Sequence, residues 1–181
     1  MSIANTSYYP DVVNGNVFIG ATAAAGVAIP ISTGTAVTFG LWNNTQNTNA
    51  AILDLSFGVT SGTIALGQLG LANQFVGYNV ASGAAMTAFT AGTPKNAMTG
   101  LGKASVMQFC PSTATLAAGG TALWWSGSSI ESATPGLGIF NAYIPIEGRI
   151  VVAPGQIVFA CASVAQTALF SISMTWVEIP R

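Results

Sequence analysis

The sequence predicts an all-β protein, an antiparallel and jelly-roll-like β-sandwich of about eight to ten strands. Residues that populate helix surfaces (Glu, Lys, Gln, Arg) are scarce, and 21 glycines interrupt most windows long enough for a helix. Short runs of alternating apolar and polar residues recur along the chain, separated by turns rich in Gly, Ser, Thr and Asn. We expect residues 1–16 to form an N-terminal arm and residues 17–181 to form a single sandwich domain.

The first half of the chain contains two alternating runs, residues 35–42 and 51–60. In the first, one face carries Val37, Phe39 and Leu41. In the second, the side chains predicted to point inward are Leu53, Leu55, Phe57 and Val59, and those predicted to point outward are Asp54, Ser56 and Gly58. Shorter strand candidates are residues 105–109, 121–125 and 138–144.

The C-terminal third contains the clearest supersecondary pattern. Two β-branched runs, residues 148–153 and 156–162, are joined by Ala-Pro-Gly, which predicts a tight hairpin because Pro154 presets φ and Gly155 supplies a positive φ. The last run, residues 168–179, predicts a half-buried strand. Its inward side chains are Phe170, Ile172, Met174 and Trp176, and its outward ones are Ser171, Ser173, Thr175 and Val177.

Two further segments are predicted to be loops. Residues 43–49 (NNTQNTN) form a polar turn. Residues 77–102 show no alternation, and we interpret them as an extended excursion with the length to reach a neighbouring subunit.

Charge is the most unusual feature of the composition. The chain has five acidic residues, four basic residues and no histidine among 181 residues, whereas an ordinary soluble domain of this length holds about 45 charged residues. A net charge of −1 provides almost no repulsion between copies. The composition therefore favours a building block whose surface is covered by neighbouring subunits.

The same composition disfavours two other classes of partner. The most apolar stretch, residues 17–31, is interrupted by Pro30 and is shorter than the roughly 20 residues of a membrane-spanning helix. No basic residue precedes it, so we expect neither an export signal nor a membrane partner. Four dispersed basic residues and a pI near 4.9 provide no footprint for nucleic acid.

Catalytic chemistry has few candidates. Without histidine, a Ser-His-Asp or Cys-His arrangement is impossible. Cys110 and Cys161 lie in apolar segments and are predicted to be buried free thiols, with no metal site and no cofactor. Glu131 and Glu147 are the carboxylate pair that could hydrolyse glycosides, and Asp54 and Glu178 also project from predicted strands. For all four we favour a role in keeping strand edges solvated. We therefore expect no enzymatic activity.

Aromatic residues remain as candidates for interaction. Trp124 and Trp125 adjoin on a predicted strand, so one faces each side of the sheet: one is expected in the core, and the other is exposed or buried by a partner. In the arm, Tyr8, Tyr9 and Pro10 are the apolar contact candidates. Core packing explains these aromatics as well, and an exposed ring could also stack on a sugar.

The C-terminal sequence resembles that of a known group of proteins. The phrases EGRIVVAPGQIVFACAS and ALFSISMTWVEIP are similar to the closing strands of small all-β virion proteins of tailed bacteriophages. The resemblance implies a jelly-roll fold and a capsid cement or decoration role, with dimers or trimers lying over joints between capsomers. It implies no catalytic residue.

Together these features predict a non-enzymatic viral structural protein. Its expected partners are further copies of itself, as a dimer or trimer, and the major capsid protein. Its expected location is the virion capsid surface, after synthesis in the host cytoplasm. The alternative hypothesis is a phage tail or fibre domain, or a lectin-like module, that binds glycans.

Overall fold

The computed structural model describes residues 8–78, 86–99, 102–130 and 141–181. For residues 127–130 and 141 it describes the backbone alone. Strands make up 57% of the structure and helix 3%, which confirms the predicted all-β class. None of the helices in the described ranges has the length and apolar character to cross a membrane.

Eight strands define the architecture, and they form two antiparallel sheets. Sheet A has the order β12-β5-β14-β1, and sheet B has the order β11-β6-β13-β4. Successive strands among these eight alternate between the sheets, except that β6 and β11 are neighbours in sheet B. This is the strand order of a jelly roll, as predicted. The eight strands are β1 (Val17–Ala21), β4 (Gly40–Trp42), β5 (Thr48–Ser61), β6 (Gly67–Phe75), β11 (Thr121–Ile130), β12 (Asn141–Val152), β13 (Gln156–Ala162) and β14 (Leu169–Pro180).

Short elements extend this framework. Sheet A gains β8 (Lys95–Asn96) beside β1 and β2 (Val27–Ala28) beside β14, while sheet B gains β9 (Gln108–Cys110) beside β4. A third sheet, sheet C, consists of β3 (Ala36–Val37), β10 (Ala114–Leu116) and β7 (Met86–Phe89). One short helix, α1 (Tyr9–Val13), precedes β1. The described part of the predicted excursion thus pairs within its own chain, through β7 and β8.

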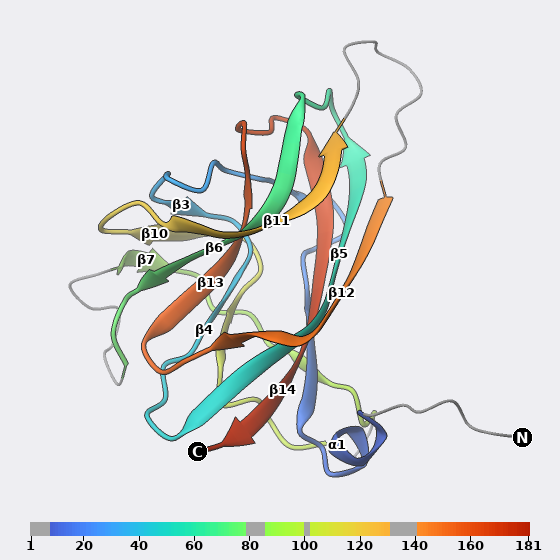
Figure 1. The fold of residues 1–181 in the computed structure, drawn as a ribbon, viewed down its shortest axis with the longest axis vertical. Helices are drawn as coiled ribbons and strands as arrows, with labels where there is room; N and C mark the ends of the chain where they lie inside the picture. The colour runs from blue at the N-terminus through green and yellow to red at the C-terminus, as the bar shows by residue number, and fades with distance from the viewer. Residues whose placement is uncertain (1–7, 79–85, 100–101, 131–140) are drawn as a thin grey trace, which may run out of the picture.

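The sheets form three layers, with sheet C, sheet B and sheet A in sequence from left to right (Figure 1). The main core lies between sheets A and B. There Trp176 of β14 stacks between Phe18 and Phe109, with ring centroids 6.1 Å from each, and Phe109 meets Phe39 edge-on at 5.3 Å. This aromatic column joins the two sheets. Gly20 is required beside it, because a Cβ there would lie 2.5 Å from the Phe109 ring.

The predicted hairpin at residues 148–162 is wrong in its pairing, although its turn is present. The Gln156 amide donates to the Ala153 carbonyl, and Gly155 has φ +79°, as expected for this turn. The flanking strands, however, pair with different partners: β12 pairs with β5 in sheet A, and β13 pairs with β4 and β6 in sheet B. The turn therefore carries the chain from one sheet to the other.

The predicted strand over residues 35–42 is also divided between layers. Val37 of β3 packs in the core between sheets B and C, whereas Phe39 and Leu41 pack in the core between sheets A and B. The three side chains therefore do not share one face, because the chain leaves sheet C at residue 38 and enters sheet B at Gly40.

The buried Asn43 side chain joins two crossings between the sheets. Its Nδ2 donates to the carbonyl of Thr48 at 2.7 Å and to that of Val152 at 2.9 Å. Its Oδ1 accepts from the Thr45 amide and hydroxyl, and its backbone bonds to Gly155 and Gln156. One amide thereby fastens the β4–β5 connection to the β12–β13 turn.

We predict that Asn43→Ala destabilises the fold by about 2 to 3 kcal/mol, because the buried Val152 carbonyl loses its side-chain donor and the part-buried Thr48 carbonyl loses its shorter hydrogen bond. Urea unfolding measures the change. Asn44→Ala is the matched control from the same turn: its Oδ1 is buried without a hydrogen-bond partner in the described structure, so its removal should cost little. Equal losses for the two variants would contradict this role for Asn43.

Candidate interaction surface

The two outer faces of the sandwich are covered differently. Sheet C packs on the outer face of sheet B, burying a cluster that includes Trp42, Ile157 and Phe159. On the outer face of sheet A, a small cluster is covered by the N-terminal segment at one end only: its buried members are Val17, Ala51, Leu53 and Val177. The rest of this face has no layer over it in the described ranges, so it is the candidate interaction surface.

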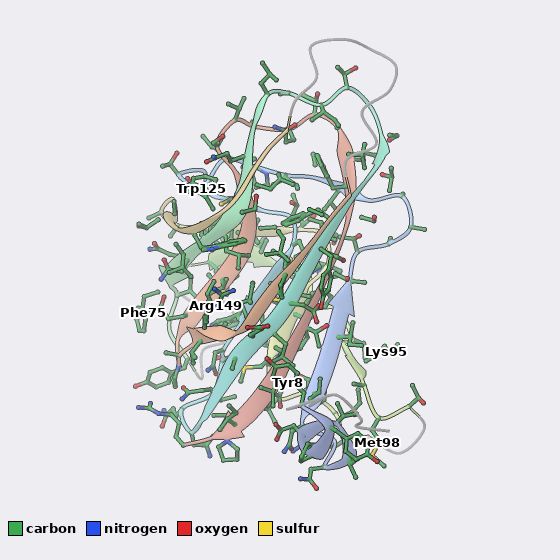
Figure 2. All side chains as sticks on the ribbon, turned by 45° about the vertical axis from the view of Figure 1, so that its right-hand side comes forward. Tyr8, Phe75, Lys95, Met98, Trp125 and Arg149 are labelled. Carbon is green, nitrogen blue, oxygen red and sulfur yellow. The ribbon has the colours of Figure 1, made fainter. Side chains whose placement is uncertain are left out.

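Helix α1 forms the cover. Pro10 occupies the first turn, where its missing amide hydrogen costs no helical bond, and Asp11 is also in that turn. Tyr8 and Val12 pack against the buried cluster, so this part of the predicted arm lies on sheet A. Tyr9 projects away with 65% of its surface exposed, and Pro10 is exposed. Figure 2 shows Tyr8 over the sheet beside α1.

Leu53 reaches this outer cluster through a β-bulge, contrary to the predicted inward orientation. Asp54 of β5 pairs with Thr175 of β14, and the next pair along these strands is Ile52 with Trp176. Leu53 therefore has no partner on β14. Ile52 and Leu55 therefore both face the main core, and Leu53 packs with Val177 on the outer face. The inward predictions for Leu55 and Phe57 are confirmed.

The bare part of the face carries hydroxyl side chains in cross-strand rows. In one row Tyr143, Ser56, Ser173 and Ala21 lie on successive strands from β12 to β1. The Ser56 and Ser173 hydroxyls are 2.6 Å apart. In the adjacent row, the Thr175 hydroxyl donates to Asp54 Oδ1 at 2.9 Å. Tyr143 is the most exposed large apolar residue of the described chain, at 70%.

The electrostatics of this face centre on one carboxylate. Burial raises the pKa of Asp54 above its ordinary value of 3.8, and the Thr175 hydrogen bond opposes that rise. Asp54 in turn raises the pKa of the Tyr143 hydroxyl, with smaller contributions from burial, Glu147 and Tyr8. Lys95 occupies the same row on β8, but β14 and β1 lie between it and Asp54. The region around Asp54 is therefore hydroxyl-rich and weakly acidic.

Exposed apolar side chains also gather on this side of the molecule. Of thirteen large apolar side chains exposed in the described ranges, six belong to α1 or to outward positions of sheet A: Tyr9, Val13, Ile19, Tyr143, Val151 and Ile179. With so few charges in the chain, these residues make the outer face of sheet A the surface best suited to a partner.

The structure places each tryptophan of the predicted pair against its own chain. Trp124 packs on the core between sheets A and B. Trp125, which is labelled in Figure 2, packs on the core between sheets B and C. Both are half-buried, so their opposite orientations are as expected. Trp124 also lines an apolar groove of about 280 Å³ between the edge strands, together with Leu123, Ile146, Arg149 and Ile150.

Glu147 and Arg149 lie in an irregular part of edge strand β12. Residues 146–149 bulge out of register with β5, with φ +55° at Glu147 and +76° at Gly148. The Arg149 guanidinium closes the bulge by donating to the carbonyls of Pro145 and Ile146 at 2.8 and 2.9 Å. Glu147 is exposed. Glu131, its predicted partner carboxylate, lies outside the described residues. A bulge and a proline on an edge strand discourage pairing with another sheet.

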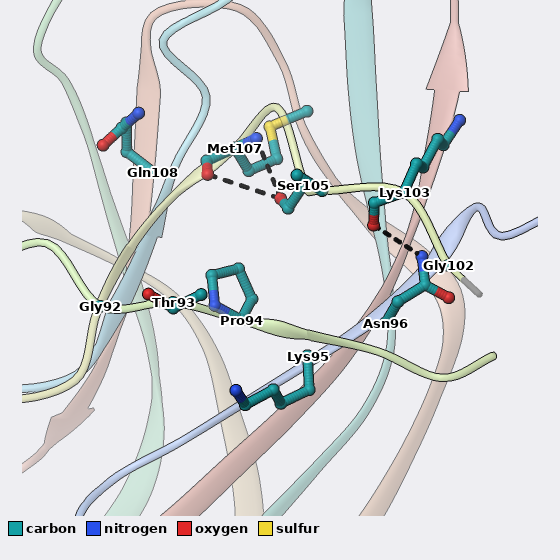
Figure 3. A pocket seen from close by; sticks show the side chains of 11 residues that line it. Gly92, Thr93, Pro94, Lys95, Asn96, Gly102, Lys103, Ser105, Met107 and Gln108 are labelled. Carbon is teal, nitrogen blue, oxygen red and sulfur yellow. Dashed lines mark hydrogen bonds between the residues drawn. The ribbon is translucent and has the colours of Figure 1, made fainter. Parts of the chain in front are cut away.

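A cavity of about 410 Å³ lies between residues 92–96 and 102–108 (Figure 3). Its polar side chains bind these two segments to each other and to the neighbouring β1 and β14 regions. The Asn96 amide donates to the carbonyls of Gly15 and Lys103. The Ser105 hydroxyl donates to Glu178, which also accepts from the Val106 amide and the Trp176 indole. Glu178 is only 4% exposed, so it does not keep a strand edge solvated as predicted.

The cysteines are buried free thiols, as predicted. Burial raises the pKa of Cys161 to about 12, and burial is also the main cause of the raised pKa of Cys110. Both thiols therefore stay protonated near neutral pH and are poor nucleophiles. No group of three or more metal-binding side chains occurs in the described part of the chain.

Comparisons with protein-family models, with curated proteins and with solved structures find no match to this chain. The resemblance to phage virion proteins thus remains an expectation based on the C-terminal phrases.

We predict that Asp54→Asn reduces the loss of stability with rising pH. The folded state holds the Asp54 proton more tightly than the unfolded chain, so this group favours folding fully below pH 3.8 and loses that contribution as pH rises through the folded pKa. Urea unfolding from about pH 3 to 7 measures the slope. An unchanged slope in the variant would show that Asp54 is not the group responsible.

Proposed function

We propose that this protein is a non-enzymatic capsid cement or decoration protein that stabilises a phage head. In this proposal it self-associates as a dimer or trimer and packs on the lattice of the major capsid protein. The observation that carries the proposal is the near absence of charge, nine charged residues in 181, combined with an outer sheet face that has no covering layer in the described ranges. The C-terminal resemblance to small virion proteins is consistent with it.

The physical basis is burial of uncharged surface. Apolar area removed from water contributes about 25 cal/mol per Å², from which the entropy lost on association is subtracted. On a shell, many copies lie close together, and a net charge of −1 keeps their mutual repulsion small. Tyr9 and Val13 on α1 and Ile19 on β1 supply exposed apolar contacts on the bare side.

We predict that the purified protein forms an oligomer whose mass is insensitive to salt. Contacts between uncharged surfaces are not screened, in contrast to those that depend on ion pairs. Light scattering from about 0.05 to 1 M NaCl measures the mass. A monomer at every salt concentration would contradict self-association.

We predict that Tyr9→Ser weakens binding to shells of the major capsid protein by about tenfold or more, since a buried interface tyrosine often contributes over 1 kcal/mol. Co-sedimentation with shells measures binding. Tyr78→Ser is the matched control, because Tyr78 is also exposed (40%) but follows β6, outside sheet A and α1. A point variant is preferred to deleting residues 1–12, since that deletion would remove Tyr8 and Val12 from the buried cluster.

Binding by Tyr9→Ser that matches the unmodified protein would exclude α1 from the contact. Failure of the unmodified protein to bind any shells would overturn the decoration role itself.

A further inference from the structure

A shallow depression on the bare face of sheet A has the chemistry of a sugar site. It has a volume of about 140 Å³ and lies where the chain leaves β1, between residues 21–24 and the serines of β5 and β14. Its lining consists of hydroxyl and methyl groups, apart from one isoleucine: Ala21, Thr22, Ala23, Ala24, Ser56, Ser171, Ile172 and Ser173. No charged side chain is among these residues.

An aromatic residue lies beside the depression, on the neighbouring strand. Tyr143 stands directly opposite Ser56 in the β12–β5 register, and Ser56 stands opposite Ser173. From Tyr143 to Ala21 the row crosses three strand spacings, about 14 Å. The Tyr143 side chain is 70% exposed, so one face of its ring is open to a ligand. The row is therefore longer than a single sugar ring.

Asp54 supplies a strong acceptor beside this row. Its Oδ1 accepts from Thr175, while Oδ2 accepts no hydrogen bond from the described residues. Lys95 lies three strand spacings away at the end of the Asp54 row, and the Arg149 guanidinium donates to the carbonyls of Pro145 and Ile146. A carboxylate oxygen that is partly withdrawn from water favours hydroxyl donors from a ligand.

We propose that this row binds a neutral carbohydrate, with the pyranose C–H face on the Tyr143 ring and its hydroxyls on Ser56, Ser173 and Asp54. A sugar carries both C–H surface and hydroxyl groups, and this row places the hydroxyls of Ser56 and Ser173 between the Tyr143 ring and the Ala21 methyl group. An anionic ligand would meet Asp54 without a compensating cation. A cationic ligand would find one carboxylate but no acceptor of comparable strength in the depression.

This inference goes beyond the proposed decoration role, and it is tested independently of that role. The two proposals depend on different residues, Tyr9 on α1 and Tyr143 on β12, and the shell-binding test needs no sugar. The sugar test uses the isolated full chain and no capsid shells. Each proposal can therefore fail while the other holds.

The experiment is saturation-transfer NMR of the purified protein with methyl glycosides of glucose, galactose, mannose and N-acetylglucosamine, and with their 1,4-linked disaccharides. We expect transfer to at least one of these probes, and a disaccharide should bind more tightly than its monosaccharide. Tyr143→Ala should weaken binding about tenfold or more, and Asp54→Asn should weaken it less. Tyr78→Ala, which removes an exposed tyrosine elsewhere, should leave binding unchanged.

Three results would overturn the proposal: no transfer to any probe, equal transfer in the unmodified protein and in Tyr143→Ala, or equal loss in Tyr78→Ala. Urea unfolding shows whether Tyr143→Ala is folded. If it is not, two other variants replace it in the comparison: Tyr143→Phe, which keeps the ring and should keep binding, and Ser56→Ala, which removes a hydroxyl and should weaken binding. If no sugar binds and Tyr143→Ala instead lowers the mass in light scattering, the face is a contact between copies and the sugar site is rejected.

Discussion

The buried Asn43 amide is the interaction on which the architecture depends most. A jelly roll sends its chain back and forth between two sheets, so its stability requires the crossings to be held in register. Asn43 binds the carbonyls of Thr48 and Val152, and it thereby fixes the β4–β5 and β12–β13 crossings against each other. In a nearly charge-free protein this role falls to neutral hydrogen bonds. Gln166 acts similarly elsewhere, binding the Ala65 backbone through both ends of its amide and so fastening the β13–β14 connection to the residues before β6.

The third layer gives the sandwich two unlike faces. Sheet C covers sheet B with apolar contacts, while in the described ranges α1 and Ala97 pack on one end of sheet A and most of its outer surface has no covering layer. Hydroxyl groups and a single carboxylate make that surface compatible with water despite the low charge of the chain. The same groups, with Tyr143 beside them, can contact either a protein lattice or a sugar. Both proposals therefore concern the outer side of sheet A, but they depend on different residues, Tyr9 on α1 and Tyr143 on β12.

Local sequence patterns predicted much of this surface correctly. The alternation in residues 51–60 and 168–179 placed Asp54, Ser56, Ser173 and Thr175 on the outward side, where the register confirms them. It misplaced Leu53, because a bulge depends on how two neighbouring strands pair and leaves no mark in the alternation of one strand. Tyr143 lay within a predicted strand but was not singled out, since nothing nearby in sequence indicates that Asp54 and Ser56 are its neighbours.

By itself, the sequence determined the strand-rich class, the scarcity of charge, the absence of histidine chemistry and the turn at Pro154-Gly155. These follow from composition, from the period of side-chain alternation and from the φ values that proline and glycine favour, all of which are local. Only the tertiary structure decided that this turn joins two sheets, that each tryptophan packs on a different core and that most of the outer face of sheet A has no cover from the described residues. Those outcomes depend on which strands far apart in the chain become neighbours, and that choice is made by the packing of the whole core.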